Sequence, residues 1–402
     1  MMLNASWYKI LSLSALQGSI VLAWVIYNIY LPKLLVSCGL SASLAITLII
    51  IENAIAFILE PLFGSLSDRA YRWIATKFGF ISLGVIITSV ISMLIPTIVI
   101  FQNLFSAIDW ILPGVLIAWA MAMTIFRTPA ISLIGRYAFT SDLPIAMSFL
   151  TLVGGFVGAI RPVVQDFILS LGAPVAFTIA SIVLLAATAL LRHFDPPMTT
   201  NLGVTTSEPI IPMKVGLLIG TGLGIAWGSR CLLETLPKII AIHIPQIDAK
   251  LMMVFISLTI AISAIPGGLF AAKYGNRRVM LIGLITTSIA LLTTVFMPTS
   301  LTISIAISLI IICFSWVTNG AVPFAIGLFP ADRMGLAIGF YFSGFSAGLS
   351  SFSSMFNPIS TLTPLLGATL GSIGFILAGV CILISVWFDR QLSRQVTELT
   401  VR

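Results

Sequence analysis

Long apolar segments make up most of the chain, and short polar segments separate them. The hydrocarbon core of a bilayer is about 30 Å thick, so a helix needs about 20 apolar residues to cross it. Twelve such segments fit the sequence, whereas the alternating segments of a membrane β-barrel are absent. We therefore predict an all-α membrane protein with twelve transmembrane helices. The expected spans are residues 10–32, 41–64, 74–101, 110–134, 143–168, 172–192, 213–236, 246–271, 278–296, 300–327, 334–357 and 363–388.

The predicted helices form two halves of six. Residues 193–212 are polar and rich in Pro and Thr, and they separate an N-terminal half, residues 1–192, from a C-terminal half, residues 213–402. The halves repeat each other, since Leu-Pro-Lys at residues 31–33 recurs at 236–238. Two repeated six-helix halves are typical of transporters that bind their solute between the halves near the midplane.

Composition and charge narrow the class of protein. Only 8% of residues are charged and 59% are hydrophobic, whereas soluble domains carry about 25% charged residues. A soluble enzyme and a secreted scaffold are thereby excluded. With both termini in the cytoplasm, 14 of the 20 Lys and Arg residues fall on cytoplasmic segments and three fall outside. The positive-inside rule then explains the net charge of +7 without a nucleic-acid partner. A plasma or inner membrane is expected.

Signatures of catalysis and of metal binding are missing from the sequence. The four cysteines lie far apart and the two histidines are 50 residues from each other, so no metal site is expected. The sequence has no nucleophile elbow, no HExxH and no P-loop. We therefore expect no enzyme and no cofactor. A gradient of protons or another cation would supply the energy for any transport.

The loop after the second predicted helix carries a specific motif. It reads Gly64-x-Leu-x-Asp68-Arg69-x-x-Arg72, and a second copy after the eighth helix holds Lys273 and Arg277. This pattern resembles the loop signature of the major facilitator superfamily. The resemblance implies that superfamily's fold and an alternating-access mechanism. It also implies that Asp68 is a gate residue, which caps a helix end in the outward-open state. Ala272 stands where the second copy often has Asp, so we place the working gate charge in the first half.

Two segments within the first half resemble a narrower group. Residues 60–64, Glu-Pro-Leu-Phe-Gly, are similar to the acidic-Pro-x-x-Gly segment of cation-coupled glycoside–pentoside–hexuronide carriers. The segment that begins at Arg127 is similar to the same region of that group and of sucrose-type carriers. Sodium-coupled members have an acid where Arg127 stands, and sucrose-type carriers tend to have Arg. The resemblance therefore implies coupling to protons rather than to sodium.

Charged residues inside a membrane usually face a cavity or a partner. The helical rise places Glu60 and Arg127 at similar depth, so we expect an ion pair between them. The pair is either a working switch, opened by a proton or by substrate, or a permanent structural contact. Asn53 lies on the same stripe of the helix as Glu60. Glu52, near the midplane, is either a protonatable site or a neutral packing residue.

Aromatic residues and two further arginines leave alternatives open. The residues that either wall a cavity or join an interfacial aromatic belt are Trp24, Tyr27, Asn28 and Trp227. Arg161, close to Asp166, and Arg230, four residues before Glu234, lie near the outer ends of their helices. We expect these two pairs to reach the membrane interface rather than the substrate.

The sequence thus favours a monomeric secondary transporter, a symporter for a small polar solute such as a sugar or small organic anion, driven by protons. One alternative is an exporter of drugs or lipophilic compounds, favoured by the apolar chain and by glycines at residues 154, 155 and 158. Another is a non-transporting membrane assembly factor of the same fold, favoured by the loss of the acid at Ala272.

Overall fold

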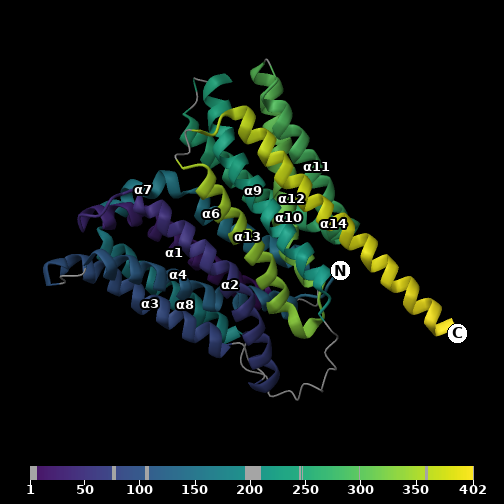
Figure 1. The fold of residues 1–402 in the computed structure, drawn as a ribbon, viewed down its shortest axis with the longest axis horizontal. Helices are drawn as coiled ribbons and strands as arrows, with labels where there is room; N and C mark the ends of the chain where they lie inside the picture. The colour runs from purple at the N-terminus through teal and green to yellow at the C-terminus, as the bar shows by residue number, and fades with distance from the viewer. Residues whose placement is uncertain are drawn as a thin grey trace.

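The computed structural model describes residues 7–74, 78–104, 108–194, 210–243, 246, 248–297, 299–357 and 361–401. Within these ranges, only the backbone is described for residues 71–74, 104, 108, 249 and 392–401. The described chain is helical, with helices gathered into one bundle (Figure 1). By length and apolarity, ten of the described helices can cross a membrane, and an eleventh span arises if the bent pair described below counts as one. The protein is therefore an integral, multi-pass membrane protein.

Eight α-helices and one short 3-10 helix build the first half of the chain. They are α1 (Trp7–Ser37), α2 (Leu44–Ile74), α3 (Phe78–Ile100), η1 (Gln102–Leu104), α4 (Ile108–Ser132), α5 (Ile134–Tyr137), α6 (Leu143–Ala159), α7 (Arg161–Ser170) and α8 (Ala173–Phe194). The predicted single span 143–168 is broken in the structure, because α6 and α7 meet at an angle of 59°. Pro162, near the start of α7, lacks the N–H that a continuous helix needs and crowds the preceding turn.

Six α-helices and one 3-10 turn build the second half. They are α9 (Pro212–His243), α10 (Ala249–Tyr274), α11 (Asn276–Thr294), α12 (Ser300–Ile326), η2 (Ala331–Arg333), α13 (Met334–Met355) and α14 (Pro364–Val401). Each of the twelve predicted spans overlaps one of these helices or the α6–α7 pair. α13 is not among the ten membrane-crossing helices; it is rich in Gly and Ser, and it packs between α2 and α9. Small side chains suit close helix packing inside a membrane.

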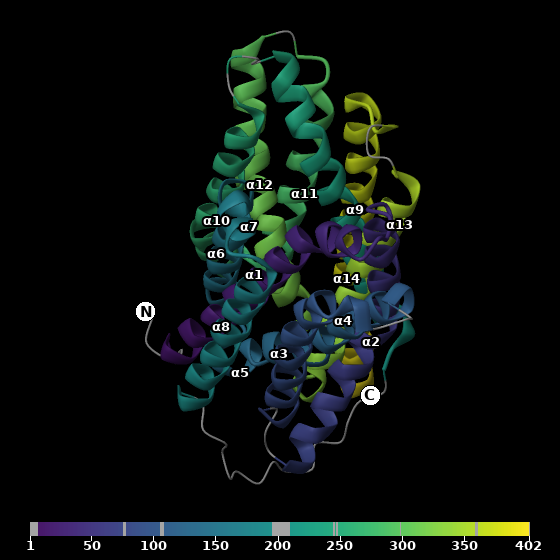
Figure 2. The ribbon, with the colours of Figure 1, turned by 90° about the vertical axis from the view of Figure 1, so that its left-hand side faces the viewer.

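Two apolar cores hold the bundle together. The larger core is built mainly from α1 to α8 and includes three residues of α12 and α13, and the other is built from α9 to α14. A third, smaller cluster lies where α9 meets the end of α13. The two groups of helices meet along α2 against α13 and along α6 against α10 (Figures 1 and 2). Most of the predicted linker lies outside the described residues, between the end of α8 and residue 210. The division of the chain at residues 193–212 therefore stays a prediction.

Glycines allow the two groups of helices to touch at one end of the bundle. A Cβ at Gly64 of α2 would collide with the carbonyl oxygen of Gly335 on α13. A Cβ at Gly268 of α10 would lie 2.6 Å from the carbonyl oxygen of Pro144 on α6. The glycines of α2 and α10 occupy equivalent places in the repeat, 204 residues apart. The repeat predicted from the sequence thus appears as two equivalent close contacts between the halves.

Candidate substrate site

A cavity of about 460 Å³ lies between the two groups of helices. Its lining comes from α1, α2 and α4, from the start of α7, and from α9 and α13. On α2 the lining residues fall on one stripe, from Ile49 to Glu60, which covers about 16 Å along the helix. Six of the predicted substrate residues line this cavity: Trp24, Asn28, Glu52, Asn53, Glu60 and Arg127.

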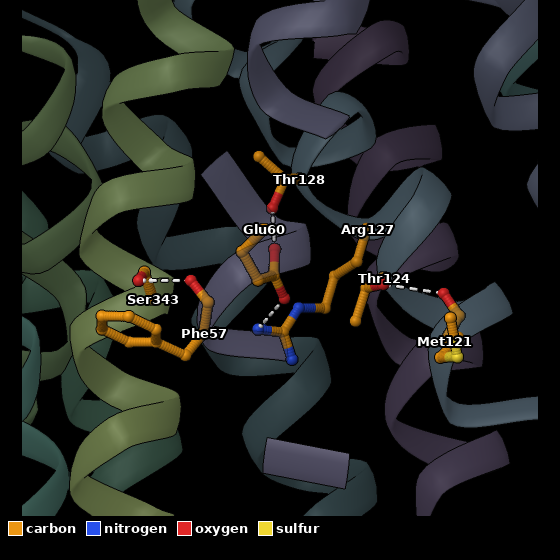
Figure 3. Close-up of polar contacts among 7 residues, drawn as sticks. All are labelled: Phe57, Glu60, Met121, Thr124, Arg127, Thr128 and Ser343. Atoms are coloured by element: carbon orange, nitrogen blue, oxygen red, sulfur yellow. Dashed lines mark hydrogen bonds and ion pairs between the residues drawn. The ribbon is translucent and has the colours of Figure 1, made fainter. Parts of the chain in front are cut away.

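The ion pair predicted from helical depth is present at one side of the cavity. Nη2 of Arg127 lies 2.7 Å from Oε1 of Glu60 (Figure 3). The hydroxyl of Thr128 donates to the other carboxylate oxygen, so Glu60 is held from two neighbouring residues of α4. Glu60 is fully buried, whereas the Arg127 side chain keeps 22% of its surface exposed. The Arg127 guanidinium also lies 4.4 Å from the centre of the Phe342 ring on α13.

This arrangement has a clear electrostatic consequence. A buried charge is tolerated when its partner remains, and removal of one partner leaves the other uncompensated. Neutralisation of Glu60 by a proton would therefore leave Arg127 without its counter-ion beside the cavity.

The second intramembrane acid has a different environment. The Tyr27 hydroxyl donates to Glu52, and the Tyr27 ring stacks on Trp119 at 4.3 Å between ring centres. The indole nitrogen of Trp119 donates to Ser92 on α3 over 2.7 Å. Tyr27 is completely buried and lies behind Glu52 rather than in the cavity lining. It holds the carboxyl group in place. Trp119 was missed from sequence, although it lies within a span rather than at the interface, where tryptophans usually gather.

Trp24 and Trp227 are in different places despite their equivalent positions in the repeat. Trp24 lines the cavity and meets Trp119 edge to face, with 5.0 Å between ring centres. Trp227 packs edge to face against Phe352 and near Phe356, and it is not among the cavity-lining residues described. The aromatic pocket formed by α9 and α13 gives Trp227 a packing role in place of the predicted cavity wall.

Two arginines that sequence analysis placed at the membrane interface line the cavity instead. Arg161 begins α7 and is exposed, and Arg230 comes from α9. Nη2 of Arg230 pairs with Oε1 of Glu234 at 3.1 Å, as the spacing predicted. Among the described residues, Arg161 forms no ion pair with Asp166 or with any other acid. The bend at Pro162 was the signal in the sequence, because it turns the start of α7 toward the bundle.

The motif of residues 64–72, which the resemblance predicts to form a gate, lies where α2 and α13 meet. Oδ1 of Asp68 accepts from the backbone N–H of Gly335 at 3.1 Å, and Oδ2 accepts from that of Leu336 at 2.8 Å. Free N–H groups of a first helical turn need such partners, and the helix dipole favours a negative charge there. Asp68 thus caps a helix of the other half. Arg69 is exposed, and the Arg72 side chain lies outside the described residues.

Comparison with known proteins agrees with this geometry. Residues 217–399 match the sequence model of the Major Facilitator Superfamily. The structure of FucP, described as a transporter of that superfamily in the outward conformation, superposes with a TM-score of 0.69 and 12% identity, over 94% of this chain and 98% of that one. The chain therefore has the major facilitator fold, and its C-terminal part is similar in sequence to that superfamily.

Two further structures show the same major facilitator fold. A bacterial homologue of the iron transporter ferroportin, in an outward-facing state, gives a TM-score of 0.72 at 16% identity, over 94% of this chain and 98% of that one. The human organic anion transporter MFSD10 gives 0.67 at 13% identity, over 93% and 99%. At these identities the likeness concerns the fold alone. No curated protein matches the sequence.

The second copy of the superfamily motif is organised differently from the first. Nη1 of Arg277 on α11 pairs with Oδ2 of Asp389 on α14 at 2.7 Å, and Nζ of Lys214 on α9 lies 3.8 Å from the same carboxylate. Lys273 is exposed and lies 5.2 Å from the centre of the Tyr274 ring. The Arg277 ion pair therefore stays within the second half, whereas Asp68 reaches across to the other half.

Proposed function

We propose that this protein is a secondary active transporter that moves a small polar solute by alternating access and couples its movement to protons. The observation that carries the proposal is the buried Glu60–Arg127 pair beside a polar cavity between the halves. We further propose that it acts as a monomer in a plasma or inner membrane, with both termini in the cytoplasm.

The contacts between the halves support alternating access. The halves are joined at the end of the bundle that carries Asp68, where its carboxylate caps α13. With the predicted orientation, this end is cytoplasmic, and the structure corresponds to an outward-facing state. The cap exists only while α2 and α13 stay together at this end. It therefore favours this state over one in which that end has opened.

The cavity chemistry supports a polar solute and a proton. Neutralising Glu60 would free Arg127 to bind solute, and the departure of the solute would restore the pair. The relatives by fold do not select one solute, since their descriptions name a fucose:proton symporter, an iron transporter and an organic anion transporter. The charges and hydroxyl groups of this cavity favour a sugar or a small organic anion over a lipophile.

Proteoliposomes test the coupling directly. Purified protein is reconstituted, an inward proton gradient is imposed, and accumulation of labelled sugars and organic anions is measured together with proton entry. Glu60→Gln is expected to abolish gradient-driven accumulation while it retains solute exchange at equal pH. The matched control is Asp109→Asn, an exposed acid at the start of α4 away from the cavity. Gradient-driven accumulation that survives in Glu60→Gln would refute proton coupling through this pair.

A second function has one observation in its favour. A second, mostly apolar cavity of about 380 Å³ lies between the halves, lined by Gly154 and Gly155 of α6 and by aromatic residues of α13. A lipophilic solute would fit this cavity, as export of such compounds requires. Lipophilic cations that stabilise the purified protein, when sugars and anions do not, would favour export. No stabilisation by any of these solutes would favour the assembly-factor alternative.

A further inference from the structure

The charges that line the polar cavity are unequal. Both of its carboxylates are engaged, Glu52 by Tyr27 and Glu60 by Arg127. The cavity also contains two more cations, Arg161 and Arg230, one from each half. The side of the cavity formed by α7 and α9 is therefore rich in positive charge.

Arg161 is a cavity-lining cation for which the described residues supply no ion-pair partner. It is exposed at the cavity, and no carboxylate pairs with it among the residues that the structure describes. Arg230, from a helix of the other half, lines the same cavity. A cation inside a bundle usually faces a partner or its ligand. Two like charges that face one cavity from opposite halves are stabilised by an anion placed between them.

We propose that Arg161 and Arg230 form an anion-binding subsite, so that the transported solute carries a carboxylate or phosphate group. The inference rests on the proposed transport function, which it narrows from polar solutes to small organic anions. The planar guanidinium group matches these anions through two parallel N–H donors, and a neutral sugar would leave the repulsion between the two arginines in place.

The position of the subsite also gives the anion a role in closure. Arg161 belongs to the first half and Arg230 to the second, so alternating access brings them together as the cavity closes on their side. Without an anion, the two positive charges oppose this approach. A bound carboxylate or phosphate contacts both arginines and removes the repulsion. The anion therefore binds more tightly to the closing state, as a solute that drives a conformational change must.

A substitution of Glu234 distinguishes anion binding by Arg230 from a purely structural role of Arg230. Its carboxylate holds Arg230, at 3.1 Å, and competes with an incoming anion for the same guanidinium. Glu234→Gln is isosteric and removes the competing charge. It is therefore expected to strengthen anion binding several-fold. If Arg230 only fastened α9 through this ion pair, the same variant would leave anion binding unchanged.

Binding to purified protein in neutral detergent measures the subsite without any gradient. The probes are glucose 6-phosphate against glucose, and succinate against succinamide, followed by thermal shift and titration calorimetry at low salt. The two anions are expected to bind and their neutral counterparts to bind at least tenfold more weakly. Arg161→Gln is expected to weaken anion binding at least tenfold, and Arg161→Lys less. Arg192→Gln, an exposed arginine at the end of α8, is the matched control and should change nothing.

The outcomes separate this proposal from the proposed function. Equal binding of neutral and charged probes, or unchanged anion binding in Arg161→Gln with a normal melting temperature, would overturn the subsite. A shift produced through Arg161 by phosphatidylglycerol alone would assign the site to a lipid headgroup and overturn the solute assignment. Gradient-driven uptake of neutral sugars only would refute the anion subsite but would agree with the proposed transport function. Anion binding that depends on Arg161, without transport of any probe, would support the subsite and contradict the proposed transport function.

Discussion

Asp68→Asn isolates the contact that joins the two halves at the predicted cytoplasmic end. Asp68 is 4% exposed and accepts two N–H groups of the first turn of α13. Asparagine keeps the size and one acceptor oxygen, but it loses the charge and the second acceptor. A hydrogen bond to a charged group contributes about 1.5–3 kcal/mol, and a charge at a helix N-terminus adds about 0.3–1 kcal/mol. We expect a loss of about 2 kcal/mol, and about 3 kcal/mol for Asp68→Ala.

This energy changes the balance between two conformations. The cap is made only while α2 and α13 are together, so its loss penalises this state and leaves the opposite state unchanged. About 1.4 kcal/mol corresponds to a factor of ten, so Asp68→Asn is expected to shift the ratio of states about thirtyfold. Transport that depends on return to the structure's state should slow accordingly.

Distances between spin labels report the shift. Exposed Ser141 and Lys273 lie on different halves near the Asp68 end, and exposed Val36 and Ile242 lie at the opposite end. In Asp68→Asn, pulsed electron paramagnetic resonance on reconstituted protein should show a longer distance between labels at residues 141 and 273. The distance between labels at residues 36 and 242 should become shorter. The four native cysteines are buried, which limits labelling at unwanted positions.

Asp142→Asn is the matched control for this change. Asp142 stands at the N-cap of α6, yet its side chain makes no capping hydrogen bond. The Asp142→Asn substitution removes an acid from the start of a helix near the same end of the bundle, without breaking a hydrogen bond between the halves. Distance distributions that stay at the wild-type values in both Asp68→Asn and Asp68→Ala would show that the cap does not set the conformational balance.

Two further predictions concern packing. Gly64→Val should separate α2 from α13, because its side chain would meet the carbonyl of Gly335, whereas Gly79→Val, with open space around it, should not; the same spin-label distances decide between them. Tyr27→Phe should destabilise the protein by about 1–3 kcal/mol, because it leaves the buried Glu52 without its hydroxyl donor. A melting temperature equal to that of the wild type would contradict this second prediction.

The sequence predicted the helices well because length and apolarity suffice for a membrane span. The α6–α7 break was harder to predict, since α6 and α7 together are apolar enough to form one span once the bend is ignored. Pro162 and the preceding Arg161 marked the place, and the structure bends there by 59°. A proline often changes the direction of a helix, but the sequence alone does not say by how much.

The candidate site was predictable only where depth along a helix was enough. The rise per residue placed Glu60 opposite Arg127, and the structure pairs them. Rotation about the helix axis was the missing information, because lipid and protein interior are both apolar and the pattern of hydrophobic residues does not distinguish them. Arg161 and Arg230 were therefore assigned to the interface although both line the cavity.

The contact between α2 and α13 connects the Glu60–Arg127 pair to the Asp68 cap. Glu60 and Asp68 are eight residues apart on α2, about 12 Å along the helix. A Cβ at Gly339 would lie 2.6 Å from the Glu60 carbonyl oxygen, and four residues earlier on α13 Gly335 donates to Asp68. A displacement of α2 against α13 near Glu60 should therefore also change the geometry of the Asp68 cap, since Glu60 and Asp68 belong to the same close contact between these two helices. Neutralisation of Glu60 and release of Asp68 would then bias the same two-state contact. Coupling between the two sites needs no additional chain of residues beyond this contact.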